Sequence, residues 1–438
     1  MVVAGLALAP VPAAVAAAAP DAPGVVSHFD LARKDCLGTA RNTTSKVWYT
    51  VAGGVLSDVY YPTVDNTNVE TLQYVVTDGT TFTDLQTRDM TYTVQSLDRS
   101  GLACRVTSTA NSGRYTIVTD YVTDPQRASV VMHSRLKVMG SGPSLKLYVR
   151  YDATVNGNGG GGTGNGGADN AVIDTSTGSP VPVSSDIVTA TIAANRDYAK
   201  PVFAALRGDK PFLAASSGYA GTPSDGFTQL DSTHTLGTTY DSAASGNVVQ
   251  TAQVDLRHTD NFTLALGFGA TQAGAVATAG NSASTSYGLT SLLYRAGWAA
   301  YDAKFNPPAH VPALSAAQRA TLRNTYYLSA NVLKASEDKT FPGAVVASLA
   351  SPWGQAVSAG DPTNTYFGSY REVFARDLYE TFTGLGPPAT SPRPRTRSGS
   401  CSTDSSRPTV PSRATAWSTA SLRLTPSEPS STRSPIQS

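Results

Sequence analysis

The sequence predicts a β-rich multidomain protein, in which a large antiparallel β-sandwich (a supersandwich) is followed by a linker helix and a short helical fragment. Three observations predict this class. Between residues 27 and 285, short alternating apolar and polar runs are separated by Gly, Asn, Asp and Pro, with hardly any helical periodicity. Helical periodicity begins only at Ser286. From Pro387 onward, Ser, Pro and Arg dominate, and such a composition cannot form a core.

The strand-rich region contains hairpin signals. Two alternating runs between Lys46 and Tyr61 flank Gly53-Gly54, which suits a two-residue turn whose central residues both need positive φ. Asp78-Gly79 is predicted to form a second such turn. Residues 128–139 and 145–151 show the alternation of half-buried strands. Because each such strand must bury its apolar side, two stacked sheets are expected.

Three helices are expected after the strands. In residues 286–311, Leu and Ala recur at three- and four-residue spacings, which predicts a linker helix. Ser315 and Gln318 form a capping box that opens a second helix, expected to end near Ser336. A third helix is expected over residues 375–385.

Composition limits the possible partners and the location. The 438 residues are 40% apolar and 15% charged, with a net charge of +1 and no Lys/Arg cluster. This balance argues against nucleic acid or an anionic membrane surface as a partner and fits a neutral glycan. Residues 1–23 contain an apolar run with a small-residue cleavage zone, which predicts a signal peptide and a secreted, extracellular protein. Pro10 and Pro12 argue against a membrane span.

The sequence offers no cofactor or metal motif. Cys36, Cys104 and Cys401 allow at most one bridge; Cys36 and Cys104 either pair or remain two unpaired strand cysteines. The five histidines lie singly, with no metal spacing. The Gly-rich run 156–170 is expected to be a loop, because no Lys and no helix follow its glycines. Calcium binding through Asp169 is possible but would need more carboxylates.

One group of residues suits a sugar ring. Arg376 and Asp377 place a planar fork of donors beside a pure acceptor at a predicted helix start, which matches mixed hydroxyl groups. Trp353, Tyr370 and Phe374 offer flat apolar faces on which a ring can rest. The alternative is an intrahelical ion pair with ordinary core aromatics.

These residues lie in segments 343–354 and 370–379, which resemble bacterial glucoamylases and glucodextranases of glycoside hydrolase family 15. In that family a Tyr, an aromatic residue and an Arg-Asp pair line the pocket that holds the terminal glucose. The family usually has Trp-Pro-Arg-Asp, whereas this chain has Phe374-Ala375-Arg376-Asp377. A second stretch, residues 34–79, resembles the β-sandwich domain that precedes the catalytic barrel in those enzymes.

The resemblance implies an exo-acting, inverting hydrolase of terminal α-glucosidic bonds in starch- or dextran-like α-glucans, and we expect a monomer. It assigns residues 27–285 to the sandwich, 286–311 to the linker helix and 312–385 to the start of an (α/α)6 catalytic barrel. Residues 386–438 are expected to be a disordered tail, and our hypothesis is a reading-frame slip, because the composition changes just after a helix has begun.

The resemblance also implies that this chain is inactive. The family's general acid and general base are glutamates of later barrel helices, so no catalytic residue is assigned here. Glu372 lies beside the sugar-binding residues, at a position that is ordinarily non-catalytic. The alternative function is a carbohydrate-binding or structural β-sandwich without catalysis. A lyase or phosphorylase on a similar plan fits less well, because those groups do not usually show the Arg-Asp helix start.

Overall fold

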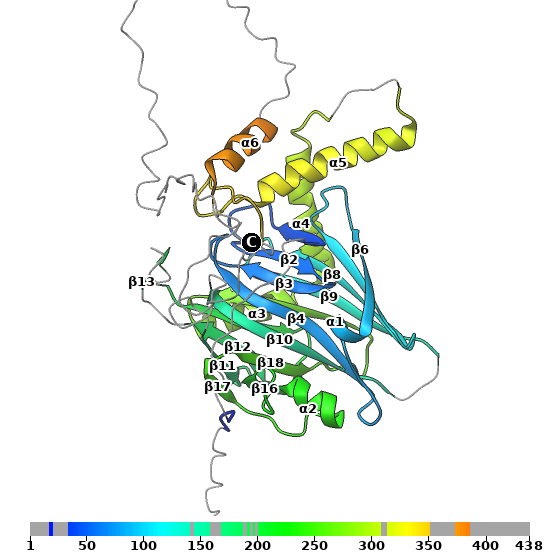
Figure 1. Ribbon diagram of the computed structural model, residues 1–438, viewed down its shortest axis with the longest axis vertical. Coiled ribbons are helices and arrows are strands. Elements are labelled where there is room, and N and C mark those ends of the chain that lie inside the picture. Colours follow the sequence, from blue (N-terminus) through cyan, green and yellow to red (C-terminus); the bar gives the residue numbers. More distant parts are fainter. Residues whose placement is uncertain are drawn as a thin grey trace, which may run out of the picture.

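The computed structural model describes residues 17–20, 34–140, 144–157, 168–186, 191–192, 196–197, 200–307, 313–350 and 373–385. Two large antiparallel sheets dominate it and face each other across an apolar core (Figure 1). The expected β-rich architecture with two stacked antiparallel sheets is therefore confirmed.

The first sheet has eight strands: β1 (Cys36–Thr39), β2 (Trp48–Ala52), β3 (Val55–Tyr60), β4 (Thr67–Thr77), β5 (Thr83–Leu85), β10 (Lys146–Gly157), β16 (Ala214–Tyr219) and β18 (Val248–Gln253). Their order is β1-β2-β3-β4-β10-β18-β16, and β5 pairs with β4. β2 and β3 are buried on both faces, because chain from the helical region covers their outer side.

The second sheet has nine strands: β6 (Met90–Ser96), β7 (Cys104–Ala110), β8 (Tyr115–Thr123), β9 (Ser129–Val138), β11 (Asp169–Asp174), β12 (Val181–Asp186), β15 (Val202–Gly208), β17 (Ser242–Gly246) and β19 (Asn261–Gly269). Their order is β17-β11-β12-β15-β19-β9-β8-β7-β6. β7 alternates buried and half-buried residues along its length, as a strand with one core-facing side should. A short pair, β13 (Thr191–Ile192) and β14 (Arg196–Asp197), stands apart.

One predicted turn is confirmed and the other is wrong. Gly53 and Gly54 have φ values of 61° and 79° and join β2 to β3, where Ala52 pairs with Val55. The strands around Asp78-Gly79 instead close at Thr77 and Thr83, so the connection is longer than two residues. The reason is local: Asp78 Oδ1 accepts the N–H groups of Thr80 and Thr81, which organises a wider loop.

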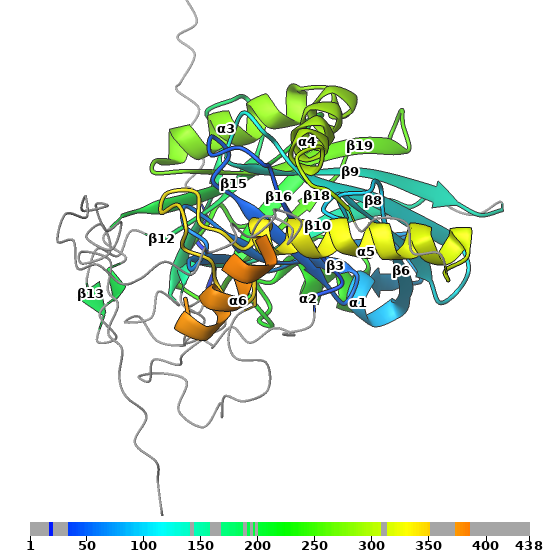
Figure 2. The same ribbon diagram turned by 90° about the horizontal axis from the view of Figure 1, so that it is seen from above.

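Helices begin earlier than the sequence predicts. Two short helices, α1 (Gln86–Asp89) and α2 (Gly226–Thr233), interrupt the strands, and α3 (Gln272–Ser284) follows β19 directly. The expectation that helices begin only at Ser286 is therefore wrong. The apolar side of α3 consists mainly of alanines, whose periodic signal is weak. It packs on β19, β15, β12 and β9, on the outer side of the nine-stranded sheet (Figure 2).

The three expected helices are present as α4 (Tyr287–Asp302), α5 (Ala316–Ala335) and α6 (Ala375–Leu385). The capping box is formed: Ser315 Oγ accepts the N–H of Gln318, and the Gln318 side chain accepts the N–H of Ser315. α5 and α6 lie beside the end of the sandwich that β2 occupies, with α4 next to them (Figure 1). In the described part of the chain, no helix has the length and apolar character needed to cross a membrane.

Cys36 and Cys104 form a disulfide, which decides between the two alternatives left open by the sequence. Their Cα atoms are 6.5 Å apart. Cys36 lies on β1 of the eight-stranded sheet and Cys104 on β7 of the nine-stranded sheet, so the bond joins the two layers of the sandwich.

Candidate functional site

The predicted Arg-Asp pair lies in the first turn of α6. Arg376 Nη2 is 3.4 Å from Asp377 Oδ2, and the side chains are 79% and 29% exposed. Asp377 occupies the positive end of the helix dipole, where a carboxylate is favourable. Because the Arg376 side chain is 79% exposed, its guanidinium is open to solvent on most of its surface. The pair can donate and accept hydrogen bonds, and it also fits the alternative of a plain ion pair.

The neighbouring predicted residues are only partly described. Phe374 is half-buried directly before α6, and its carbonyl accepts the N–H of Leu378. Trp353, Tyr370 and Glu372 lie outside the described residues. The structure therefore brings Phe374, Arg376 and Asp377 together at one helix start, and binding of a sugar by all five residues stays a prediction.

The start of α6 is attached to the sandwich. Val373 packs against an apolar cluster that contains Trp48 of β2, Tyr60 of β3 and Leu349. Along α6, Thr381 is buried, and Gly384 lies close to Leu333 of α5. The contact of Val373 thus ties the start of α6 to β2 and β3. A site at this helix start would therefore lie next to the sandwich.

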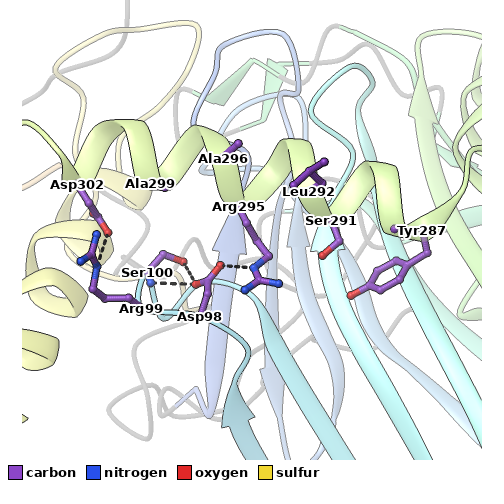
Figure 3. Close-up of a pocket in the computed structure, with 11 residues that line it drawn as sticks. Asp98, Arg99, Ser100, Tyr287, Ser291, Leu292, Arg295, Ala296, Ala299 and Asp302 are labelled. Carbon is purple, nitrogen blue, oxygen red and sulfur yellow. Dashed lines mark hydrogen bonds and ion pairs between the residues drawn. The ribbon is translucent and has the colours of Figure 1, made fainter.

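A groove of 680 Å³ runs between α4 and the loop that joins β6 to β7 (Figure 3). Two ion pairs cross the groove. Arg295 Nε lies 3.0 Å from Asp98 Oδ2, and Arg99 Nε lies 3.7 Å from Asp302 Oδ2. Asp98 Oδ1 also accepts the N–H of Ser100 at 2.9 Å.

The chemistry of the groove indicates a structural junction. Both carboxylates are held by arginines, and burial raises the pKa of Asp302. Burial also raises the pKa of Tyr287 to about 12, so its hydroxyl is a weaker acid than that of an ordinary tyrosine. Sequence reasoning missed this groove, because no local pattern relates the β6–β7 loop to a helix almost two hundred residues later.

The Gly-rich run was predicted to be a loop, with calcium binding at Asp169 as a possibility. Asp169 is fully buried on β11, and its Oδ2 accepts the N–H of Val155 at 2.8 Å. Burial raises its pKa well above the ordinary value, and the charges of Asp186 and Asp152 raise it further. Among the residues that the structure describes, no group of three or more His, Cys, Asp or Glu side chains could hold a metal ion.

Two large antiparallel sheets with helices attached at one end define a β-sandwich protein with a helical extension. The chain belongs to the family described as glucodextranase, domain N, which it matches over residues 19–303. The matched segment runs through both sheets and through α3 and α4.

Two relatives extend the match beyond that domain. A glucoamylase from Clostridium sp. (strain G0005) is 32% identical over 358 residues, which are 82% of this chain and 46% of that glucoamylase. A bacterial glucoamylase whose crystal structure was solved in complex with acarbose aligns with a TM-score of 0.69 and 30% identity. That alignment covers 83% of this chain and 48% of the crystallised chain. The chain thus spans about half the length of both relatives.

Proposed function

We propose that this chain is the amino-terminal portion of a secreted, exo-acting, inverting hydrolase of terminal α-glucosidic bonds in starch- or dextran-like glucans. The observation that carries the proposal is the 32% identity to a glucoamylase, which extends over 82% of this chain but only 46% of that enzyme. A match that continues past the sandwich into the helices supports a shared plan of sandwich, linker helix and (α/α)6 catalytic domain.

Exposed apolar side chains on the helices support a larger helical domain. On α4, Leu289 and Leu292 are 50% and 64% exposed; on α6, Tyr379 and Phe382 are 70% and 61% exposed. Adjacent large apolar side chains in water are typical of surfaces that another element covers. In the proposed enzyme, further barrel helices cover them.

In the proposal, the start of α6 holds the terminal glucose. Arg376 donates to ring hydroxyls and Asp377 accepts from them, while Tyr370 and either Trp353 or Phe374 supply the stacking faces. The exposure of Arg376 supports this role, because its donors remain available to a ligand.

The proposal assigns no catalytic group to this chain. Inversion requires a general acid and a general base roughly 6.5–9.5 Å apart, with a water molecule between them. On α6, Glu380 is exposed and does not line the groove between α4 and the β6–β7 loop. The carboxylates of the groove, Asp98 and Asp302, are held by arginines instead. The isolated chain is therefore expected to bind a glucan at most weakly and to hydrolyse none.

The test has two parts. The purified 438-residue chain is assayed for glucose release from maltooligosaccharides, and the expected result is no release above the blank. A chimera then joins residues 1–385 to the remaining part of the Clostridium glucoamylase. In an active chimera, Asp377→Ala should lower kcat/KM about 100-fold, since a buried substrate hydroxyl then loses a charged partner, which costs about 1.5–3 kcal/mol.

The matched control is Glu380→Ala, an exposed carboxylate on the same helix, which should leave kcat/KM within about twofold. Hydrolysis by the 438-residue chain would contradict the assignment as an incomplete enzyme. An active chimera that tolerates both Arg376→Ala and Asp377→Ala would contradict the proposed glucose site.

A further inference from the structure

Three cations converge where the chain after β1 meets the end of α5; we call Arg41, Lys334 and Lys339 the cationic junction. The guanidinium carbon of Arg41 lies 4.4 Å from the centre of the Tyr301 ring on α4. Lys339 lies with its Nζ 5.1 Å from the centre of the Trp48 ring and donates to the carbonyl of Ser45. Arg41 lies four residues before Ser45, and Lys334 lies in the last turn of α5, five residues before Lys339. The charge of Arg41 lowers the pKa of both lysines.

The two carboxylates nearby are already engaged. Glu337 forms an ion pair with Lys334 and accepts the N–H of Gly343 at 2.8 Å. Asp338 accepts the N–H groups of Val64, Thr340 and Phe341 at 2.6–2.8 Å. In the part of the chain that the structure describes, Arg41 has no carboxylate partner at all. Three basic side chains therefore face two carboxylates, and neither carboxylate is directed at Arg41.

Unpaired donors surround the same place. Ser45 and Trp48 are fully buried, and Ser45 Oγ, Trp48 Nε1 and Arg41 Nε have no hydrogen-bond partner among the described residues. Leaving a buried donor without an acceptor is unfavourable, so such groups normally have a partner. Because Lys339 contacts both Ser45 and Trp48, these donors adjoin the cationic junction. An acceptor with negative charge would pair with these donors and would give Arg41 the anionic partner that it lacks.

We propose that the cationic junction binds a small oxyanion, with Arg41 as the main ligand and Lys339 and Lys334 as flanking charges. Arginine suits this role because its planar fork of N–H groups matches the two oxygens of a carboxylate or the edge of a tetrahedral oxyanion. Stacking of Arg41 on Tyr301 occupies the face of the guanidinium and leaves its edge for the ligand. The bound anion would connect the loop after β1 with α4 and α5. This inference does not depend on the proposed glucan hydrolysis.

Binding should be coupled to proton uptake. Burial lowers the pKa of Lys334 to about 8, and the charge of Arg41 contributes to this shift. Burial and the charge of Arg41 also lower the pKa of Lys339 well below its ordinary value, although the charge of Asp338 opposes this shift. A bound anion favours the charged lysines and raises both values. The complex then holds more protons than the free protein, so anion affinity should fall as the pH rises through about 8.

The test uses the full 438-residue chain with inorganic sulfate or sodium acetate, each compared with chloride at constant ionic strength. We expect a saturable rise in Tm with at least one of the two anions, of about 2 °C at ten times its Kd. Arg41→Gln should abolish the saturable part. Arg135→Gln is the matched control, because Arg135 lies on the exposed face of β9 and pairs with Asp260, and it should keep the shift. Preference for sulfate or for acetate tells whether a tetrahedral or a carboxylate anion is the better ligand.

A second measurement needs no variant. Calorimetric titrations of the wild-type chain with sulfate and, separately, with acetate near pH 8, in buffers of different ionisation enthalpy, should show net proton uptake with the anion that binds, which a general salt effect does not produce. If both anions give only an unsaturable shift that Arg41→Gln retains, or if titration shows no binding and no proton uptake, the inference is overturned.

Discussion

Arg150 and Asp225 form an ion pair that is almost completely removed from water. The side chains are 10% and 1% exposed, and Arg150 Nη2 lies 2.9 Å from Asp225 Oδ2. Asp225 also caps α2, since its Oδ1 accepts the N–H of Phe227 at 2.8 Å. Asp225→Ala should lower the free energy of unfolding by about 3–5 kcal/mol, because it leaves a buried guanidinium with one carboxylate fewer. Urea unfolding measures the loss.

The control for this prediction is Asp260→Ala. Asp260 pairs with Arg135 at 2.8 Å, but the two side chains are 44% and 56% exposed. Exposed pairs typically contribute less than about 1 kcal/mol, so this variant should unfold nearly as the wild type does. Equal losses for the two variants would mean that burial does not decide the strength of these pairs.

Asp169 should make stability depend on pH. Its folded-state pKa is raised, so the folded protein holds a proton that the unfolded chain releases above its ordinary pKa of 3.8. Stability from this group is therefore lost as the pH rises from about 4 toward the folded-state pKa. Asp169→Asn keeps an oxygen for the N–H of Val155 and removes the charge. It should be more stable than the wild type at neutral pH by about 1–3 kcal/mol, the range for an unsatisfied buried acceptor.

Chemical unfolding at several pH values between 4 and 8 checks this. The advantage of Asp169→Asn should shrink as the pH falls, because Asp169 becomes protonated in both states. A variant less stable than the wild type at every pH would show that the carboxylate is stabilised in its charged form.

At the scale of elements, α3 depends on a close approach to β19. A Cβ atom at Gly267 of β19 would lie 2.7 Å from the Cα atom of Ala279, and backbone atoms cannot move aside easily. Gly267→Ala should therefore push α3 from the sheet and cost about 1–3 kcal/mol, the usual cost of overpacking. Urea unfolding gives the loss, and hydrogen exchange should localise the weakening to α3.

The matched control is the same substitution at Gly288 of α4. A Cβ atom there would meet only Ser286 Oγ, at 3.7 Å. Gly288→Ala should be neutral or stabilise by up to about 1 kcal/mol, because alanine favours a helix. If Gly267→Ala behaves in the same way, the packing of α3 on β19 is looser than described.

The elements differ in how far local sequence could predict them. The capping box at Ser315 and Gln318 marked the start of α5 correctly, because both partners lie within one turn. α3 was missed, because alanine-rich segments give little contrast between their two sides. The pairing of β4 with β10 was beyond prediction, since strands far apart in sequence are chosen by packing.

At the scale of the molecule, one covalent bond joins the two sheets. The disulfide connects residues 68 positions apart and restricts the conformations that the unfolded chain can adopt. Replacing both Cys36 and Cys104 with serine should lower the free energy of unfolding by about 2–5 kcal/mol. Urea unfolding without reductant measures this loss, and dithiothreitol should produce a similar loss in the wild type.

The single variants serve as controls for the disulfide. Cys36→Ser and Cys104→Ser should each lose about as much as the double variant, because either substitution removes the same bond. Losses that add up in the double variant would indicate that packing of the side chains matters more than the bond.

The sequence by itself determined the features that depend on neighbouring residues: the alternation of the strands, the Gly53-Gly54 turn and the starts of α5 and α6. It also carried the family resemblance. Only the tertiary structure decided the sheet order, the disulfide, the groove against α4 and the cationic junction. The physical reason is that burial and charge at these places come from residues far apart in the chain. Arg41, Lys334 and Lys339 are ordinary cations in the sequence, and packing alone brings their charges together.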